Sequence, residues 1–146
     1  MNVLIPRGSI TETQLAPHLR KGLQTLSSLA SAGFGVEQLQ TSVDVVIGDA
    51  LYINSGNKLA LADRTLHDAQ YIALSSGEED SMITITRAKL IEYSNGETLI
   101  PGNYLYLNLN GKATQTPPTA DIYQIVGLII NSTTALLYID QSYMIE

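Results

Sequence analysis

The 146-residue sequence contains no cysteine and no tryptophan, and it has a single phenylalanine. Without cysteine the chain can form neither disulfide bonds nor thiolate metal sites. No apolar run reaches the roughly 18 residues that a membrane-spanning helix requires. The N-terminus also lacks the basic start and long apolar stretch of a secretory signal. We therefore expect a soluble protein made in a cytoplasm, without a membrane partner.

Charge is also scarce, because only 15% of the residues are charged, against roughly 25% in an ordinary soluble domain. The net charge is −6 and the sequence pI is about 4.7. A nucleic acid or an anionic membrane needs a basic surface, so neither is expected as a partner. The surface must consist largely of uncharged polar residues, or be partly covered by other subunits.

What the chain does contain is an internal duplication. A shift of 54 residues aligns residues 48–54 (GDALYIN) with 102–108 (GNYLYLN), and residues 82–85 with 136–139. The aligned positions are glycines, turn residues and apolar residues of the kind found in cores. The repeated residues are therefore those that determine turns and core packing, and no set of reactive groups is repeated.

The duplication divides the chain into three parts. Residues 1–38 form a leader, and residues 39–92 and 93–146 form the two copies. This length suits one core of roughly 100–150 residues with a short appendage.

The leader is predicted to be helical. Ser9 and Glu12 have the spacing of a capping box, and Pro17 should kink or restart the helix. After Pro17, apolar residues recur at helical spacing and form one stripe: Leu19, Leu23, Leu26 and Ala30. Two heptads are too short to be a stable helix alone. The stripe must therefore pack on its own β-domain, on copies of itself or on another protein.

Each copy has the pattern of short β-strands separated by turn residues. Residues 51–53 and 105–107 are rich in residues that favour strands, and Asn and Gly follow them in turns. Asn95-Gly96 lies between two apolar runs, 90–93 and 98–100, and predicts a hairpin there. Many short strands at close spacing predict a sandwich or barrel. We therefore expect an all-β fold: a duplicated β-sandwich or β-barrel-like domain over residues 39–146, with a short helical arm over residues 1–38.

No catalytic or metal-binding constellation is evident. His18 and His67 are isolated, with no carboxylate at a spacing that would complete a metal site or a base. The run Glu78-Glu79-Asp80 could hold calcium in principle, but it lacks calcium-loop spacing, so a solvated turn is favoured. No Gly-x-Ser-x-Gly motif or phosphate loop is present. We expect no enzyme, no cofactor and no metal, although an acid pair distant in sequence would point to a small hydrolase or a lectin-like enzyme.

The eight tyrosines carry more information. Tyr52 and Tyr106 align in the repeat and are predicted to be core or subunit-interface residues. Tyr104, Tyr123 and Tyr143 have no tyrosine counterpart in the first copy. Tyrosine suits binding surfaces because it offers a large contact area at low entropic cost, and it also serves simply to fill a strand face.

The repeated elements resemble those of phage head-decoration and head-fibre proteins. The resemblance covers residues 43–140 and rests on a Gly-Asp or Pro-Gly turn (48–49, 101–102) that opens a Tyr-bearing strand. A Gly-x-Lys or Gly-Lys turn follows (56–58, 111–112), and the second copy adds a Gln-x-Val-Gly strand (124–127). Ala73 stands where the second copy has the glycine of that strand. The resemblance implies a β-sandwich or β-roll, usually a homotrimer, without catalytic activity.

The resemblance therefore implies a virion protein that decorates or cements the capsid as a trimer and binds the major capsid protein or another virion protein. The alternative is a head, neck or tail fibre that contacts host glycans. We expect the leader to dock on a neighbouring subunit or on the shell. The residues predicted to make subunit or capsid contacts are Leu15, Leu19, Leu23, Leu26, Tyr52 and Tyr106.

Overall fold

The computed structural model describes residues 35–145. These residues form two antiparallel sheets and contain no helix, which confirms the predicted all-β class. The predicted helical arm lies outside the described residues, apart from its last four positions. The predicted end of the arm at residue 38 falls inside the first strand.

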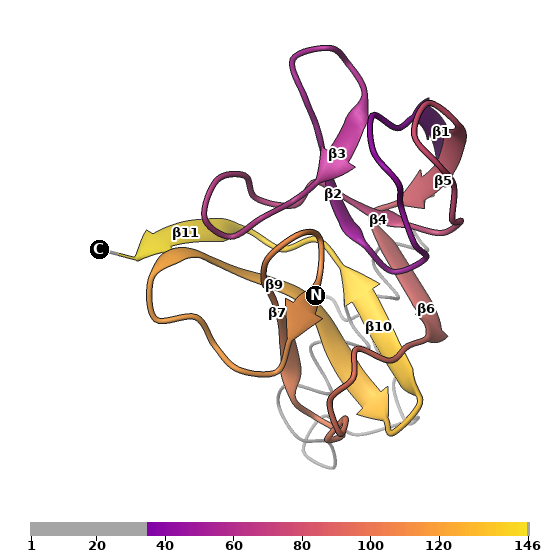
Figure 1. Cartoon of the computed structure of the whole chain (residues 1–146). Coiled ribbons are helices and arrows are strands. Elements are labelled where there is room, and N and C mark those ends of the chain that lie inside the picture. Colours follow the sequence, from indigo (N-terminus) through magenta and orange to yellow (C-terminus); the bar gives the residue numbers. More distant parts are fainter. Residues whose placement is uncertain (1–34, 146) are drawn as a thin grey trace, which may run out of the picture.

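The first sheet has the strand order β1-β5-β4-β2-β3 (Figure 1). Its strands are β1 (Glu37–Gln40), β2 (Ala50–Ile53), β3 (Leu59–Leu61), β4 (Tyr71–Ala73) and β5 (Met82–Thr86). The two edge strands of this sheet approach each other, because Thr41 bridges to Leu59 and the Ser42 amide donates to the Leu59 carbonyl at 2.8 Å. The first sheet therefore curls around a small core of its own.

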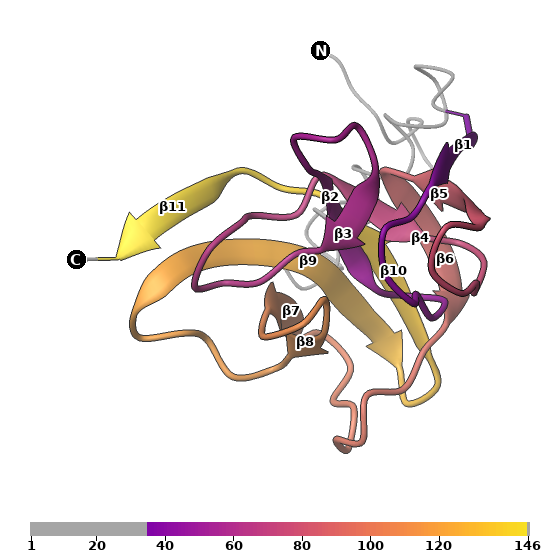
Figure 2. The ribbon, with the colours of Figure 1, turned by 45° about the horizontal axis from the view of Figure 1, so that its top comes forward.

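The second sheet has the order β6-β10-β9-β7-β8, and a further strand pairs with the first half of β9. Its strands are β6 (Ala88–Glu92), β7 (Tyr104–Leu107), β8 (Ala113–Thr114), β9 (Asp121–Asn131), β10 (Thr134–Tyr138) and β11 (Ser142–Ile145). Figure 2 shows the long, curved β9 crossing the molecule, with β11 beside its first half.

The two sheets share one strand order. With the 54-residue shift, β2 coincides with β7 and the start of β3 coincides with β8. The turns agree as well: Gly48 and Gly102 have φ angles of 94° and 92°, and Asn57 and Gly111 have 63° and 76°. A left-handed backbone favours glycine and tolerates asparagine, which explains why these residue types are repeated.

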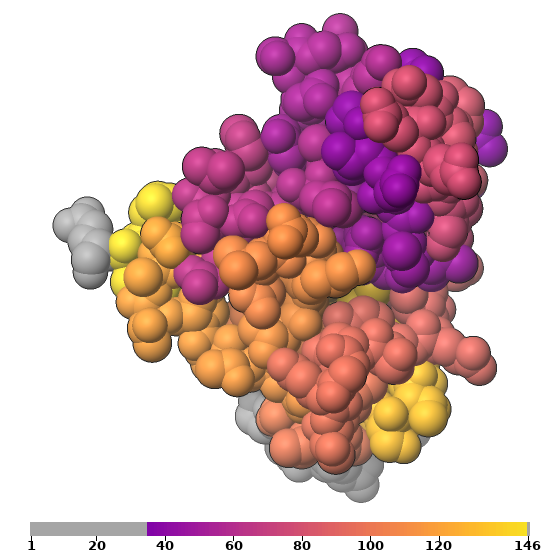
Figure 3. Space-filling model, viewed as in Figure 1, coloured from indigo at the N-terminus to yellow at the C-terminus, as the bar shows by residue number. Residues whose placement is uncertain are grey.

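One apolar core lies between the sheets. The first half contributes mostly alanines, and the second half contributes mostly larger apolar residues. Figure 3 shows the two halves in contact at the surface. This shared core contains Ala50, Ala62, Ala69 and Ile72 from the first half, and Leu99, Leu105, Leu107, Ile122, Val126, Ile129, Ala135 and Leu137 from the second.

One local prediction was wrong. The Asn95-Gly96 turn does not form a hairpin, because β6 pairs with β10 and residues 98–100 form no strand. The side chains of Asn95 and Glu97 instead bond to the end of β8, at the Ala113 carbonyl and the Gln115 amide. The interactions of this turn with a distant segment therefore replace the local pairing that its sequence favours.

Candidate functional site

A cleft lies where the two halves of the chain meet. It has a volume of about 360 Å³. Three segments line it: the turn before β2, the chain after β6, and the turn before β8. We call this feature the inter-sheet cleft, and its lining residues are Val46, Ile47, Gly48, Asp49, Tyr93, Ser94, Asn95, Gly111 and Lys112.

An ion pair crosses the cleft. Lys112 Nζ lies 2.7 Å from Asp49 Oδ1, and the Asp49 side chain is only 5% exposed while that of Lys112 is 57% exposed. The other Asp49 oxygen accepts from the Val46 amide at 3.0 Å. The buried carboxylate is thus satisfied from two sides, as a buried charge requires.

Close backbone contacts hold the turn before β8 against the first sheet. The Gly111 amide donates to the Ala62 carbonyl at 2.6 Å, and the Ala50 amide donates to the Gly111 carbonyl at 2.8 Å. A Cβ at position 111 would lie 2.9 Å from Leu61 Cδ2 and 3.1 Å from the Ala50 carbonyl oxygen. Only glycine permits this approach, and the approach places Lys112 over Asp49.

Tyr93 forms one wall of the cleft. Its burial, together with the nearby charges of Glu97 and Asp49, raises the pKa of the Tyr93 hydroxyl to about 12. The hydroxyl is therefore neutral at physiological pH and forms a hydrogen bond with the Asn95 side chain. Val46 and Ile47 form an apolar lip, since they are 57% and 53% exposed.

The cleft combines an apolar lip with polar groups on its floor, which suits the docking of another molecule. Its titratable side chains are one paired carboxylate, one lysine and one tyrosine whose pKa is raised. Sequence reasoning missed this site. The signal was Asp49, which the second copy replaces with Asn103, but nothing in the sequence places Lys112 of the other copy beside it.

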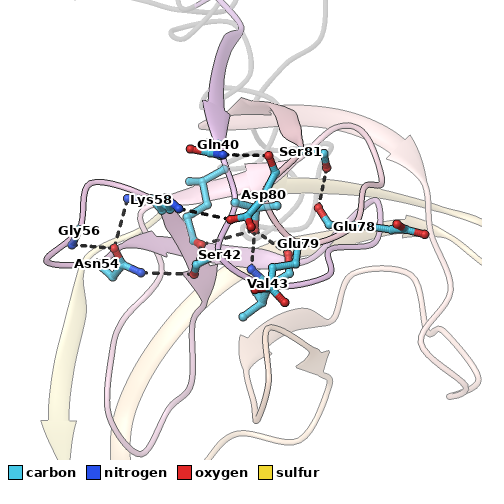
Figure 4. A network of polar contacts seen from close by, with 12 residues as sticks. Gln40, Ser42, Val43, Asn54, Gly56, Lys58, Glu78, Glu79, Asp80 and Ser81 are labelled. Atoms are coloured by element: carbon cyan, nitrogen blue, oxygen red, sulfur yellow. Dashed lines mark hydrogen bonds and ion pairs between the residues drawn. The ribbon is translucent and has the colours of Figure 1, made fainter.

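The acidic turn at residues 78–80 is exposed to solvent, as predicted, and Figure 4 shows its polar contacts. Asp80 pairs with Lys58 at 3.2 Å, its φ angle is 69°, and both side chains are exposed. The Ser81 hydroxyl donates to the Glu78 carbonyl at 2.6 Å, and the Glu78 side chain points away from Asp80. The three carboxylates do not converge. Within residues 35–145 no group of three or more histidine, cysteine or acidic residues could hold a metal ion.

The histidine that the structure describes serves packing. His67 is exposed and stacks on Tyr52, with ring centroids 4.1 Å apart and an interplanar angle of 18°. The other histidine, His18, lies outside the described residues.

Two of the predicted contact residues lie in the structure, and both pack internally. Tyr52 is half-buried against the shared core, and Tyr106 is 8% exposed. Tyr106 makes edge contacts with Tyr104 and Tyr123, with centroids 6.5 and 5.3 Å apart. Leu15, Leu19, Leu23 and Leu26 lie outside the described residues. The structure thus brings Tyr104, Tyr106 and Tyr123 together on the second sheet.

Among residues 35–145 there is no helix of the length and apolar character that crossing a membrane requires. Comparisons of the chain with protein-family models, curated proteins and solved structures find no match.

Proposed function

We propose that this chain is a non-enzymatic structural protein of a phage particle, which decorates and stabilises the capsid shell as a homotrimer. The observation that carries the proposal is the duplication of a Gly-turn-Tyr-strand unit whose repeated residues serve turns and packing. Gly48 and Gly102 open β2 and β7 with the same backbone conformation. This is the pattern by which the sequence resembles decoration and head-fibre proteins. The proposal also includes the N-terminal arm expected over residues 1–38.

The exposed apolar residues at the inter-sheet cleft support a docking role. Val46 and Ile47 are 57% and 53% exposed. Exposed apolar side chains grouped beside polar residues are typical of protein-protein contacts. In a symmetric particle, modest contacts of this kind are multiplied by the number of copies.

The proposal is tested by quantitative mass spectrometry on purified particles of the source phage. A copy number comparable to that of the major capsid protein would support a decoration protein. The absence of the chain from particles would refute the virion assignment. Light scattering of the purified full chain measures whether it is a trimer.

A variant pair tests the docking surface. The double substitution Val46→Asp/Ile47→Asp should abolish binding to particles that lack the protein. Leu66→Asp is the matched control, because Leu66 is 73% exposed on a different loop. Equal binding by the two variants would exclude the cleft lip as the contact surface.

The same cleft supports a second candidate, a head, neck or tail fibre that binds host glycans. Asp49, Asn95 and Lys112 supply acceptors and donors beside the ring of Tyr93, which is the mixture of groups that a sugar hydroxyl and its apolar face require. Binding of the full chain to a host glycan, lost in Asn95→Ala, together with a low copy number per particle, would favour this function.

A further inference from the structure

The second sheet has a second apolar face, opposite the shared core. On β10, Ala135 and Leu137 point into the shared core, whereas Leu136 and Tyr138 lie on the other face with Leu128 of β9. Leu128, Leu136 and Tyr138 are 0%, 1% and 3% exposed. We call this surface the outer face. Among residues 35–145, the apolar residues packed around it belong to the same sheet: Ala88, Tyr104, Ile125 and Ile130.

Burial on both faces requires a covering layer on each. A sheet that is apolar on both sides occurs where both sides are covered. The first sheet covers one face, and among residues 35–145 no element from outside the second sheet belongs to the outer-face cluster. The Tyr138 hydroxyl is buried and has no hydrogen-bond partner among these residues, although a buried hydroxyl ordinarily has one. Both observations indicate a further layer.

The duplication does not account for this face. The positions 54 residues earlier are Leu74, Met82 and Thr84. Met82 is 58% exposed, and Leu74 and Thr84 are half-buried. The first copy therefore leaves the corresponding surface partly open, and the apolar character of the outer face is specific to the second copy.

The described part of the chain begins at Gly35, which lies close to the outer face. Gly35 lines a small pocket with Thr86 and Arg87. The next residue, Ala88, belongs to the outer-face cluster and pairs with Tyr138 across β6 and β10. An extended chain spans about 3.3 Å per residue, so a few residues suffice to reach the centre of the face.

We infer that the outer face is the docking site of residues 1–34 of the same chain, which place the apolar stripe of Leu19, Leu23 and Leu26 on Leu128, Leu136 and Tyr138. The stripe needs an apolar partner to be stable, and the face needs a cover. This inference departs from the expectation that the stripe binds a neighbouring subunit or a shell. It does not depend on the proposed function, and it leaves contact with a particle to other surfaces such as the inter-sheet cleft.

A spin label in the full chain tests the inference, and the absence of native cysteine makes the labelling site unique. Thr25→Cys places a nitroxide two residues after Leu23, roughly 200° around a helix and away from the stripe. We expect paramagnetic broadening of the amide signals of Leu128, Leu136 and Tyr138, with Leu51 and Ile83 unaffected. Ser55→Cys is the control, because Ser55 is an exposed turn residue of the first half. Unbroadened outer-face signals in the Thr25→Cys protein would overturn the inference.

A mixed sample identifies the chain that supplies the stripe. Labelled protein without nitrogen-15 is combined with unlabelled nitrogen-15 protein, so that only contacts between copies cause broadening. Broadening of Leu136 in this mixture would assign the outer face to a second copy and would refute the same-chain assignment. No broadening in the mixture, with broadening in the singly labelled chain, is the expected result.

Hydrogen exchange gives an independent measure. In the full chain, Leu23→Ser/Leu26→Ser should accelerate amide exchange in β9 and β10 by roughly tenfold or more, because uncovering a buried face lowers its local stability. Exchange of Leu51 and Ile83 should remain slow. Leu66→Ser, at an exposed leucine, should change neither set. Unchanged exchange of β9 and β10 in the double variant would refute the inference.

Discussion

Gln124 offers the sharpest test of how the two halves of the chain are joined. Its side chain is 1% exposed and makes three hydrogen bonds. Its Oε1 accepts from the Ala69 amide at 2.7 Å, and its Nε2 donates to the carbonyls of Ala69 and Asp140, each at 2.9 Å. One amide side chain of the second sheet thus satisfies both backbone groups of a buried residue of the first half.

The substitution Gln124→Leu keeps most of the side-chain volume and removes all three bonds. Ala69 is 3% exposed, so water does not readily replace the lost partners. An unsatisfied buried polar group costs about 1–3 kcal/mol. With two such groups at Ala69, and with partial compensation from the apolar leucine, we expect a loss of roughly 2–5 kcal/mol in the free energy of unfolding. This is a large fraction of the total stability of a domain.

The repeat supplies a matched control. Gln70 occupies the position 54 residues earlier, is exposed, and accepts from the Ile53 amide at 2.9 Å. Water can replace this bond, so Gln70→Leu should cost only about 0.5 kcal/mol or less. Urea unfolding of the three full chains, followed by circular dichroism, measures the difference. Equal losses for the two substitutions would refute the claim that burial and the orphaned Ala69 groups set the cost.

Four further predictions follow from the packing and the charges. Gly127→Ala should cost about 1–3 kcal/mol of stability, because a Cβ there would lie 2.9 Å from Leu137 Cδ2 and 3.0 Å from the Leu136 carbonyl oxygen; a neutral effect in urea unfolding would contradict this. Lys112→Met leaves the buried Asp49 carboxylate without its cation and should lower the free energy of unfolding by about 1–2 kcal/mol, a figure that allows for the exposure of the lysine. Lys58→Met, at the exposed pair with Asp80, should lower it by about 0.5 kcal/mol or less. Equal losses would refute the distinction between the buried and the exposed pair. Partial burial raises the pKa of Glu97, but hydrogen bonds from Thr114, Gln115 and Asn95 outweigh it and hold the pKa below its usual value of 4.5. The resulting stabilisation is present above pH 4.5 and is lost as the pH falls through the lowered pKa. Glu97→Gln should therefore make the melting temperature less sensitive to acid. A melting temperature with the same pH dependence as that of the original chain would contradict this prediction. Ala50→Leu should overpack the shared core and cost about 1–3 kcal/mol, whereas Ala120→Leu, in an exposed loop, should be nearly neutral in the same urea assay.

The sequence predicted those parts of the fold that depend on local chemistry. Strands at residues 51–53 and 105–107 follow from β-propensity, and the turns at Gly48 and Gly102 follow from the left-handed backbone that each adopts. The hairpin at Asn95-Gly96 failed because β6 finds a better partner in β10, which is distant in sequence. Local turn propensity does not determine which strand completes a sheet.

The candidate site was less predictable than the fold. The Asp49–Lys112 pair joins residues 63 positions apart, and its formation depends on the close approach of Gly111 to the first sheet. The repeat aligns Lys112 with Lys58, which pairs with Asp80 within its own copy. The same residue type therefore makes an internal contact in one copy and a contact between the copies in the other, a difference that alignment alone does not show.

The divergence of the two copies follows from their different neighbours. Ala50 and Ala69 of the first copy lie in the shared core, and the residues 54 positions later are Tyr104 and Tyr123. Both alanines are buried in the core between the sheets, so a tyrosine at either position would have to displace other core side chains. At the equivalent positions the second copy carries tyrosines, which meet Tyr106 in edge contacts. The first sheet imposes no such restriction there. Tyr104 and Tyr123, which have no tyrosine counterpart in the first copy, thus mark positions where the two copies pack differently. In this duplicated chain, the residues that differ between the copies identify the interface between the two sheets better than the repeated residues do.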